Sequence, residues 1–219
     1  MTRVPSRLFY MRIAARLKRL VFIPTLVVGL AAACADHVEP TEALGADSSS
    51  TDDTTFQALY AATLPAPLPT VAYVDPARYI GVWYEIASVP QFFSVGCTCT
   101  TATYTLVDAT TLGVFNECRL NAADGPVNAI AGRALVSPAT GNARLQVEFL
   151  PIFRAPYWII ALADDYSTVM IGDPTRGSLF ILARARTLNA TTYTELLAYA
   201  GNLGFNTARV NVTPQTGCP

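Results

Sequence analysis

The stretch Gly81-Val82-Trp83-Tyr84-Glu85-Ile86-Ala87 decides the fold of this chain, and it follows Val74-Asp75-Pro76-Ala77-Arg78-Tyr79-Ile80. It places a glycine, which tolerates the backbone conformations of tight turns, directly before a strand that carries a tryptophan. The tryptophan is expected to face inward from the start of that strand. The stretch therefore predicts a β-barrel that is closed at one end.

Beyond Val74 the sequence consists of short β-type runs separated by turn residues, at the spacing typical of an antiparallel sandwich or barrel. The run Arg144-Leu145-Gln146-Val147-Glu148-Phe149 alternates strictly, which predicts Leu145, Val147 and Phe149 on the inner face. The pattern predicts eight strands, at residues 82–89, 100–108, 111–120, 127–137, 143–150, 156–163, 167–172 and 178–184.

A single helix is expected after the last of these strands. Asn189 is suited to cap its N-terminus, and Gly204 is suited to end it. Between them, apolar residues recur at helical spacing, at Tyr193, Leu196, Leu197 and Ala200.

Two further stretches stand in the order that a closed barrel of this kind requires: Ala163-Asp164-Asp165-Tyr166 and Leu179-Phe180-Ile181-Leu182-Ala183-Arg184. Together with the opening stretch they resemble the lipocalin family, from about Val74 to about Val212. Within the family, the resemblance points to the bacterial outer-membrane lipoprotein lipocalins and the apolipoprotein D-like members. It implies an all-β fold, an eight-stranded antiparallel up-and-down barrel with a C-terminal α-helix packed outside. Such a barrel has room for one small ligand.

The resemblance also assigns structural roles to the motif residues Gly81, Trp83, Asp165, Tyr166 and Arg184. Trp83 is expected to pack across the closed end, with the guanidinium of Arg184 over its ring. Arg186 is the alternative to Arg184, although it lies beyond the expected strand end. The pair Asp164 and Asp165 could suggest acid–base or metal chemistry, but neighbouring residues in a turn diverge. We expect them to accept backbone hydrogen bonds instead.

The first 33 residues have the pattern of a lipoprotein signal peptide. A basic segment at 12–19 precedes an apolar run from Leu20 to Leu30, which is shorter than the roughly 20 residues that span a bilayer. The run ends in Leu30-Ala31-Ala32-Ala33-Cys34, which resembles a bacterial lipobox and predicts lipidation of Cys34. The alternative is an ordinary signal peptide whose Ala-x-Ala site happens to precede a cysteine.

Residues 34–72 are expected to be a flexible tether, and residues 73–219 the lipocalin domain. The tether is rich in Ala, Thr, Ser, Asp and Pro, with few large apolar side chains to offset the entropy of ordering. Ala35, rather than aspartate, follows the lipidated cysteine, which favours the periplasmic face of the cell outer membrane. The inner membrane stays open as an alternative.

Charge and composition argue against several other classes of function. After Cys34 the chain has nine arginines against 16 acidic residues, a formal charge of −7, so nucleic acid is not an expected partner. His37 is the only histidine and lies in the expected tether, which argues against a histidine-based triad or zinc site in the domain. Since no phosphate loop, nucleophile elbow or dinucleotide fingerprint occurs, we expect no catalytic residue, no metal and no cofactor.

Four cysteines remain once Cys34 is set aside, and an even number in an exported protein predicts two disulfides. A hairpin turning near residues 109–111 would bring Cys97 close to Cys118. The resemblance implies that Cys99 bonds to the C-terminal tail at Cys218, as in apolipoprotein D-like members. The swapped pairing, Cys99 with Cys118 and Cys97 with Cys218, remains open.

The inner wall is expected to be aliphatic and aromatic, which suits an acyl chain. Arg133 or Arg154 could pair with an anionic headgroup near the open end, and the loop 150–156 could form an apolar lip there. Strand parity and the family's inward positions predict ligand contacts at Tyr104, Leu145, Val147, Phe149, Tyr157, Ile159, Phe180 and Leu182.

The resulting hypothesis is a membrane-anchored lipocalin that binds and stores or transports a fatty acid, lysophospholipid or similar molecule, without catalysis. Its partners would be the small hydrophobic ligand and the membrane, and the resemblance also allows a homodimer. One alternative is a lipocalin-fold enzyme acting on a lipid or isoprenoid, with Glu85 as the carboxylate to test. The other is a surface interaction module whose barrel is filled by its own side chains.

Overall fold

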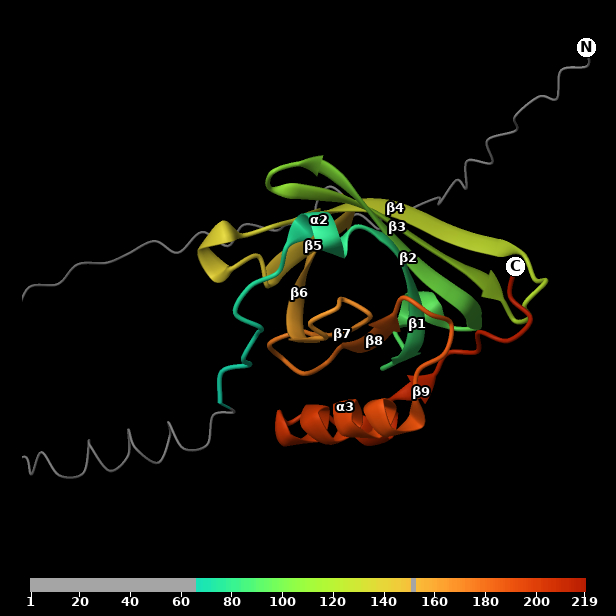
Figure 1. Ribbon diagram of the computed structural model, residues 1–219. Helices are drawn as coiled ribbons and strands as arrows, with labels where there is room; N and C mark the ends of the chain where they lie inside the picture. The colour runs from blue at the N-terminus through green and yellow to red at the C-terminus, as the bar shows by residue number, and fades with distance from the viewer. Residues whose placement is uncertain (1–65, 151–152) are drawn as a thin grey trace, which may run out of the picture. The chain divides into compact units, whose positions relative to one another are not determined.

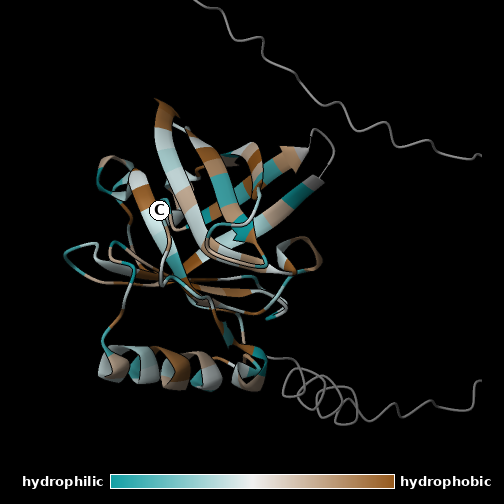
Figure 2. Ribbon diagram, turned by 90° about the vertical axis from the view of Figure 1, so that its right-hand side faces the viewer, coloured by the Kyte–Doolittle hydropathy of each residue, from teal (hydrophilic) through white to brown (hydrophobic). Residues whose placement is uncertain are grey.

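Residues 66–150 and 153–219 are described by a computed structural model, in which alternating apolar and polar residues form an antiparallel β-sheet (Figures 1 and 2). The strands are β1 (Gly81–Ser88), β2 (Cys97–Asp108), β3 (Thr111–Leu120), β4 (Val127–Leu135), β5 (Arg144–Leu150), β6 (Phe153–Leu162), β7 (Thr168–Gly172), β8 (Leu179–Ala183) and β9 (Asn211–Val212). The helices are α2 (Pro76–Tyr79) and α3 (Ala190–Asn202), with 3-10 turns η1 (Phe92–Ser94), η2 (Pro138–Thr140) and η3 (Thr207–Arg209).

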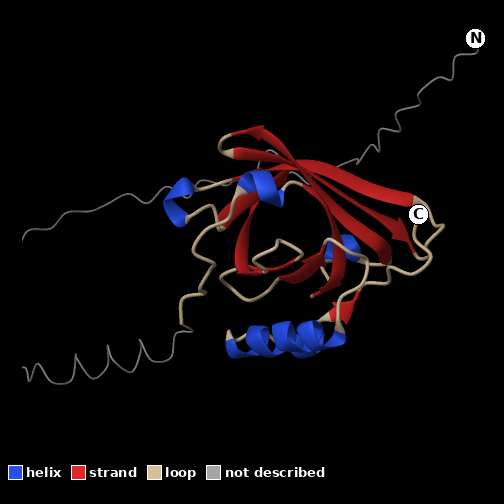
Figure 3. Ribbon diagram, in the orientation of Figure 1, coloured by secondary structure: helices blue, strands red, loops and turns tan. Residues whose placement is uncertain are grey.

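The sheet closes on itself because β1 pairs with strands from both ends of the meander. Strands β2 to β8 follow one another in sequence order, β8 pairs with β1, and β1 also pairs with β2. Figure 3 shows the strands as a ring, with α3 outside it. Within the described residues, the predicted eight-stranded antiparallel barrel with an external C-terminal helix is confirmed.

The predicted strand boundaries differ from those in the structure by at most three residues. The largest differences are at β2, which begins at Cys97, and at β6, which begins at Phe153. Helix α2 and the short strand β9 were not predicted. Both are too short to show a periodic pattern, so the sequence carries no signal for them.

Helix α3 begins after Asn189, whose side chain accepts a hydrogen bond from the backbone N–H of Thr191 at 2.8 Å. Its apolar face covers the outer side of the barrel, where it packs over an outer cluster of apolar residues. The buried members of this outer cluster are Leu68, Ile86, Val89, Ile160, Met170, Leu179, Ile181, Ala183, Ala200 and Phe205.

The end of the segment predicted to be a flexible tether is packed on the barrel. Leu68 is only 2% exposed and belongs to the outer cluster, and the backbone N–H of Val71 donates to Ile159 at 3.0 Å. The folded part of the chain therefore begins before residue 73, because Leu68 packs into an apolar site on the outside of the barrel. The predicted signal peptide, Cys34, His37 and the tether up to residue 65 lie outside the described residues.

Candidate functional site

The inner wall of the barrel is largely apolar and contains every residue predicted to line it. These residues form an inner cluster with Trp83, Val114 and Val169, among others. Tyr104, Leu145, Val147, Ile159 and Leu182 are buried in the inner cluster, whereas Phe149, Tyr157 and Phe180 are partly buried against it.

Strand register explains why these side chains gather on one face. Leu145 lies opposite Tyr157, and Val169 lies opposite Leu182. Directly opposite residues in an antiparallel pair point to the same side of the sheet. Closure of the barrel then converts one face of each strand into a continuous inner wall.

Trp83 closes one end of this interior. Its side chain is completely buried, and its Nε1 donates to the backbone carbonyl of Tyr79 at 2.9 Å. The guanidinium carbon of Arg184 lies 3.8 Å from the centre of the tryptophan ring. Arg186, the alternative partner, lies instead over the ring of Tyr84 at 4.7 Å.

Arg184 also ties the segment before β1 to the end of β8. Its Nη2 donates to the carbonyl oxygens of Arg78, Tyr79 and Ile80 at 2.9, 3.0 and 2.9 Å, and its Nη1 donates to Val82 at 2.8 Å. Gly81 permits this arrangement because it has a φ of +99° and because a Cβ there would lie 3.2 Å from Arg184 Nη1.

The turn that carries Asp164 and Asp165 supports the same closed end. Tyr166, at a φ of 61°, accepts the backbone N–H of Asp75 on its hydroxyl at 2.8 Å, and Arg78 stacks on its ring at 4.0 Å. Hydrogen bonds from Ser167 hold the pKa of Asp165 below its usual value.

Within the described residues, no group of three or more His, Cys, Asp or Glu side chains could hold a metal ion.

Three tyrosine hydroxyls meet inside the barrel above Trp83. Tyr104 donates to the hydroxyl of Tyr157 at 2.8 Å, and the hydroxyl of Tyr79 lies 2.7 Å from the same oxygen. We call Tyr79, Tyr104 and Tyr157 the tyrosine cluster. Burial raises the pKa of Tyr104 to about 12 and raises the pKa values of Tyr79 and Tyr157 well above their usual value, so all three are neutral at physiological pH.

The tyrosine cluster links opposite sides of the barrel, since β2 and β6 are four strands apart in the ring. On its closed side the packing is dense, and a void of only ≈ 10 Å³ lies between Val74, Tyr79, Leu112 and Leu145. That volume holds about one water molecule. The tyrosine cluster and Trp83 therefore form the floor of the interior.

On the other side of this floor, the inner wall is accessible. Ile130 continues the inward row Trp83, Ala102 and Asn116 across the register of β1 to β4, and it is 44% exposed. Phe149 and Phe180 are also only partly buried, although they face the inner cluster. Apolar residues that face inward and still contact solvent define a barrel that opens at this end.

Glu85 points into the barrel and is hydrogen-bonded to its neighbours through one carboxylate oxygen. It is 8% exposed, and its Oε1 accepts hydrogen bonds from Thr213 Oγ1 at 2.6 Å and from Ser88 Oγ at 3.0 Å. Burial raises the pKa of its carboxyl, while these two hydrogen bonds act in the opposite direction. The carboxylate has no nucleophilic or basic partner among these contacts.

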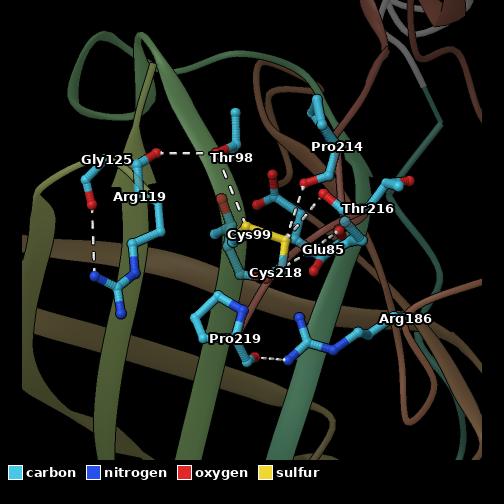
Figure 4. Close-up of a disulfide and its surroundings, with 12 residues drawn as sticks. Glu85, Thr98, Cys99, Arg119, Gly125, Arg186, Pro214, Thr216, Cys218 and Pro219 are labelled. Carbon is cyan, nitrogen blue, oxygen red and sulfur yellow. Dashed lines mark hydrogen bonds between the residues drawn. A yellow bond between two sulfur atoms is a disulfide. The ribbon is translucent and has the colours of Figure 1, made fainter. Parts of the chain in front are cut away.

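Two disulfides hold the open half of the barrel. Cys97 bonds to Cys118 across the β2–β3 pair, with 21 residues of sequence separation. Cys99 bonds to Cys218, 119 residues away, and so attaches the C-terminal segment to β2 (Figure 4). The swapped pairing is not found in the structure.

The expectation that Arg133 or Arg154 faces an anionic ligand is not met. Both pair with Glu148 across the β4–β5–β6 register, with Arg133 Nε 2.6 Å from Glu148 Oε2 and Arg154 on the other oxygen. Strand parity puts all three on the outer face, because Val147 and Phe149 face inward. Pro151 and Ile152, from the predicted apolar lip, lie outside the described residues.

Several residues of the interior were not predicted as site residues. Tyr79 could have been suspected from its spacing of four residues before Trp83. Asn116 could have been suspected because it continues the alternation of Leu112 and Val114 on β3. Thr213 and Gln215 belong to a tail with no periodic pattern.

The barrel is closed at one end by Trp83 and the tyrosine cluster, has a largely apolar inner wall and is open at the other end. These features define a calyx-type binding fold. The lipocalin-like domain model matches residues 74–215. Temperature-induced lipocalin-1 of Arabidopsis thaliana is 36% identical over 160 residues, which cover 69% of this chain and 85% of that protein. Outer membrane lipoprotein Blc of Escherichia coli K12 is 34% identical over 155 residues, covering 71% and 87%.

Among solved structures, insecticyanin of the tobacco hornworm Manduca sexta aligns with a TM-score of 0.55 at 18% identity, covering 70% of this chain and 89% of that one. At this identity the likeness shows the fold alone. The sequence matches go further: this chain belongs to the lipocalin family. Among the described residues, no helix has the length and apolar character needed to cross a bilayer.

Proposed function

We propose that this lipocalin binds a small hydrophobic ligand, such as a fatty acid, a lysophospholipid or a similar molecule, above the floor formed by the tyrosine cluster. The observation that carries the proposal is the gradient of exposure along the inner wall. Apolar inward residues are buried at the floor and accessible toward the mouth. Each CH₂ group transferred from water to such a wall contributes about 0.8 kcal/mol.

Of the eight inward residues, Val147, Phe149, Phe180 and Leu182 lie on the open side of the floor and supply the proposed contacts. Tyr104 and Tyr157 belong to the floor, and Leu145 and Ile159 line the small void beneath it. Storage or transport is the role that such binding would serve. A catalytic role for Glu85 is the weaker candidate, because its hydrogen-bond partners are two hydroxyls and it lacks a base or nucleophile. Formation of a product from candidate lipids, abolished in Glu85→Gln, would favour the enzyme.

Phe180→Ala is expected to weaken binding of an apolar fluorophore about tenfold, because Phe180 faces the inner wall and is still accessible. Phe115→Ala is the matched control: Phe115 has outward parity on β3 and is 43% exposed. Titration of N-phenyl-1-naphthylamine by fluorescence measures both. Equal loss in the two variants would contradict binding inside the barrel.

Native mass spectrometry of protein taken from its own membrane tests the remaining alternative, an interaction module whose barrel is filled by its own side chains. A mass increment matching a lipid supports the proposed function. A protein that stays free of ligand and also fails to take up the fluorophore would favour a filled barrel that acts as an interaction surface.

We further propose that Cys34 carries a lipid anchor that holds the domain at the periplasmic face of the outer membrane. The signal-like sequence before Cys34 supports this, as does the similarity to a relative named as an outer membrane lipoprotein. Cys34→Ser is expected to move the protein from the membrane fraction to the soluble fraction, since covalent acyl chains supply the membrane affinity. Fractionation of cells expressing each form is the measurement. Retention of the variant in the membrane would refute the anchor.

A further inference from the structure

A second feature of the inner wall is polar, and it lies one row beyond Trp83 along β1. Glu85 is paired with Leu182 and Ser88 with Phe180, both of which face the inner cluster. A β-bulge between Glu85 and Ala87 places Glu85 and Ser88 on the same face. Both side chains therefore point into the barrel.

The C-terminal segment completes this polar region by filling the gap where β1 and β2 separate. The backbone N–H of Thr213 donates to Ile86 at 2.9 Å, and the N–H of Cys99 donates to Pro214 at 2.8 Å. Gln215 Nε2 donates to the carbonyls of Glu85 and Thr100, each at 2.9 Å, so it bridges the two strands. Figure 4 shows this segment beside the Cys99–Cys218 disulfide.

Alternation along the segment turns its polar side chains inward. Thr213 and Gln215 are each 9% exposed, whereas Pro214 and Thr216 are exposed. Thr213 reaches Glu85 directly. We call Glu85, Ser88, Thr100, Thr213 and Gln215 the Glu85 cluster.

The hydrogen-bonding groups of this cluster are only partly used within the described structure. Both hydrogen bonds to the Glu85 carboxylate end on Oε1, and neither ion pair among the described residues involves Glu85. Thr100 Oγ1 and Gln215 Oε1 are buried without a hydrogen-bond partner in the described structure. Asn116 Oδ1, in the same inward row as Ala102 and Trp83, is also buried and unpartnered.

A buried polar atom without a hydrogen-bond partner costs about 1–3 kcal/mol, and three such atoms on the inner faces of β2, β3 and the C-terminal segment indicate a site for a polar group of the ligand. An anion cannot serve, because it brings further acceptors and would face Glu85. A hydroxyl group can donate to the amide oxygens of Asn116 and Gln215 and can accept from the hydroxyl of Thr100, without bringing a charge.

We propose that the Glu85 cluster and Asn116 bind the uncharged, hydroxyl-bearing end of an amphipathic ligand, such as a monoacylglycerol, and discriminate against a carboxylate on the same acyl chain. This inference rests on the proposed function, since it assumes that the calyx takes up an acyl chain. It adds the class of polar group and the residues that select it.

The test compares two ligands that share a chain. Monolauroylglycerol and laurate are used at pH 8 to displace N-phenyl-1-naphthylamine from the intact protein. Monolauroylglycerol is expected to displace the fluorophore at a concentration at least tenfold lower than laurate. Glu85→Gln is expected to reduce this preference at least fivefold, because it removes the charge while keeping the side-chain shape. Glu117→Gln is the matched control, since Glu117 has outward parity on β3.

Asn116→Leu provides an independent variant should Glu85→Gln fail to fold. It replaces an unpartnered buried acceptor by an apolar side chain of similar size, so the melting temperature is expected to stay level or rise. Monolauroylglycerol affinity is expected to fall about fivefold, while laurate affinity stays unchanged. A purely structural asparagine would not give this combination.

The outcomes separate the two proposals. If both ligands displace the fluorophore equally well, or if the preference survives in Glu85→Gln and Asn116→Leu, the polar subsite is refuted while lipid binding stands. If the protein binds neither the fluorophore nor either ligand, the proposed function fails, and the subsite fails with it.

Discussion

Replacing Cys99 and Cys218 together by alanine is expected to lower the free energy of unfolding by about 5 kcal/mol. The bond closes a loop of 119 residues, and the chain-entropy relation gives roughly this value for such a loop. The same relation gives about 3.3 kcal/mol for the 21-residue loop closed by Cys97 and Cys118. Urea unfolding followed by circular dichroism measures both.

The double alanine variant of Cys97 and Cys118 is the control, because it removes a disulfide from the same strand β2. The Cys99–Cys218 variant has a further expected loss, since its tail is free to leave the gap between β1 and β2. Thr213 and Gln215 would then no longer contact Glu85. A larger destabilisation from the shorter loop would contradict the assigned role of the tail.

Trp83→Ala is expected to cost about 3–5 kcal/mol, the range for removing a large aromatic side chain from a core. The ring is fully buried, it lies 5.1 Å from the ring of Tyr79 between centroids, and it supports Arg184. Thermal and urea unfolding give the measurement. The other tryptophan, Trp158, is the control: it lies at the edge of the outer cluster, is only partly buried and contacts Arg144. Trp158→Ala should cost less than Trp83→Ala.

Arg184→Ala tests the same closed end from its other side. Its cost is expected to be smaller, about 1–3 kcal/mol, from the lost cation–π contact and the carbonyl groups left without their donor. Ligand preference should be unchanged, because Arg184 lies beneath the floor. An Arg184→Ala protein as stable as the parent, or one with altered preference, would contradict this arrangement.

Much of the barrel could be predicted because each strand encodes its own alternation. The run 144–149 predicts an inward face without reference to any other strand, and the turns between runs separate the strands. The positions of Trp83 and Arg184 came from a family resemblance, since nothing in either residue alone says that they meet. The disulfide between Cys97 and Cys118 was predicted from the hairpin of β2 and β3, whereas no periodic pattern indicates the partner of Cys99.

The side-chain contacts that were wrongly predicted depend on how separate strands and segments pack together. Arg133 and Arg154 were expected to face a ligand, but the register of three strands brings both to Glu148. Leu68 was assigned to a tether, yet an apolar site built from β1, β6, β7, β8 and α3 accepts it. Neither set of partners follows from the alternation of a single strand.

The amino-acid sequence by itself determined the strands, their inward faces and the position of the external helix, because alternation and helical spacing are local properties of the chain. Only the tertiary structure decided which polar groups enter the barrel. The bulge at Glu85 rotates one side chain relative to the next, and the disulfide of Cys218 lays the tail beside it. Barrel closure brings together segments that are more than a hundred residues apart in the sequence. Alternation and helical spacing describe only neighbouring residues, so they cannot predict such contacts.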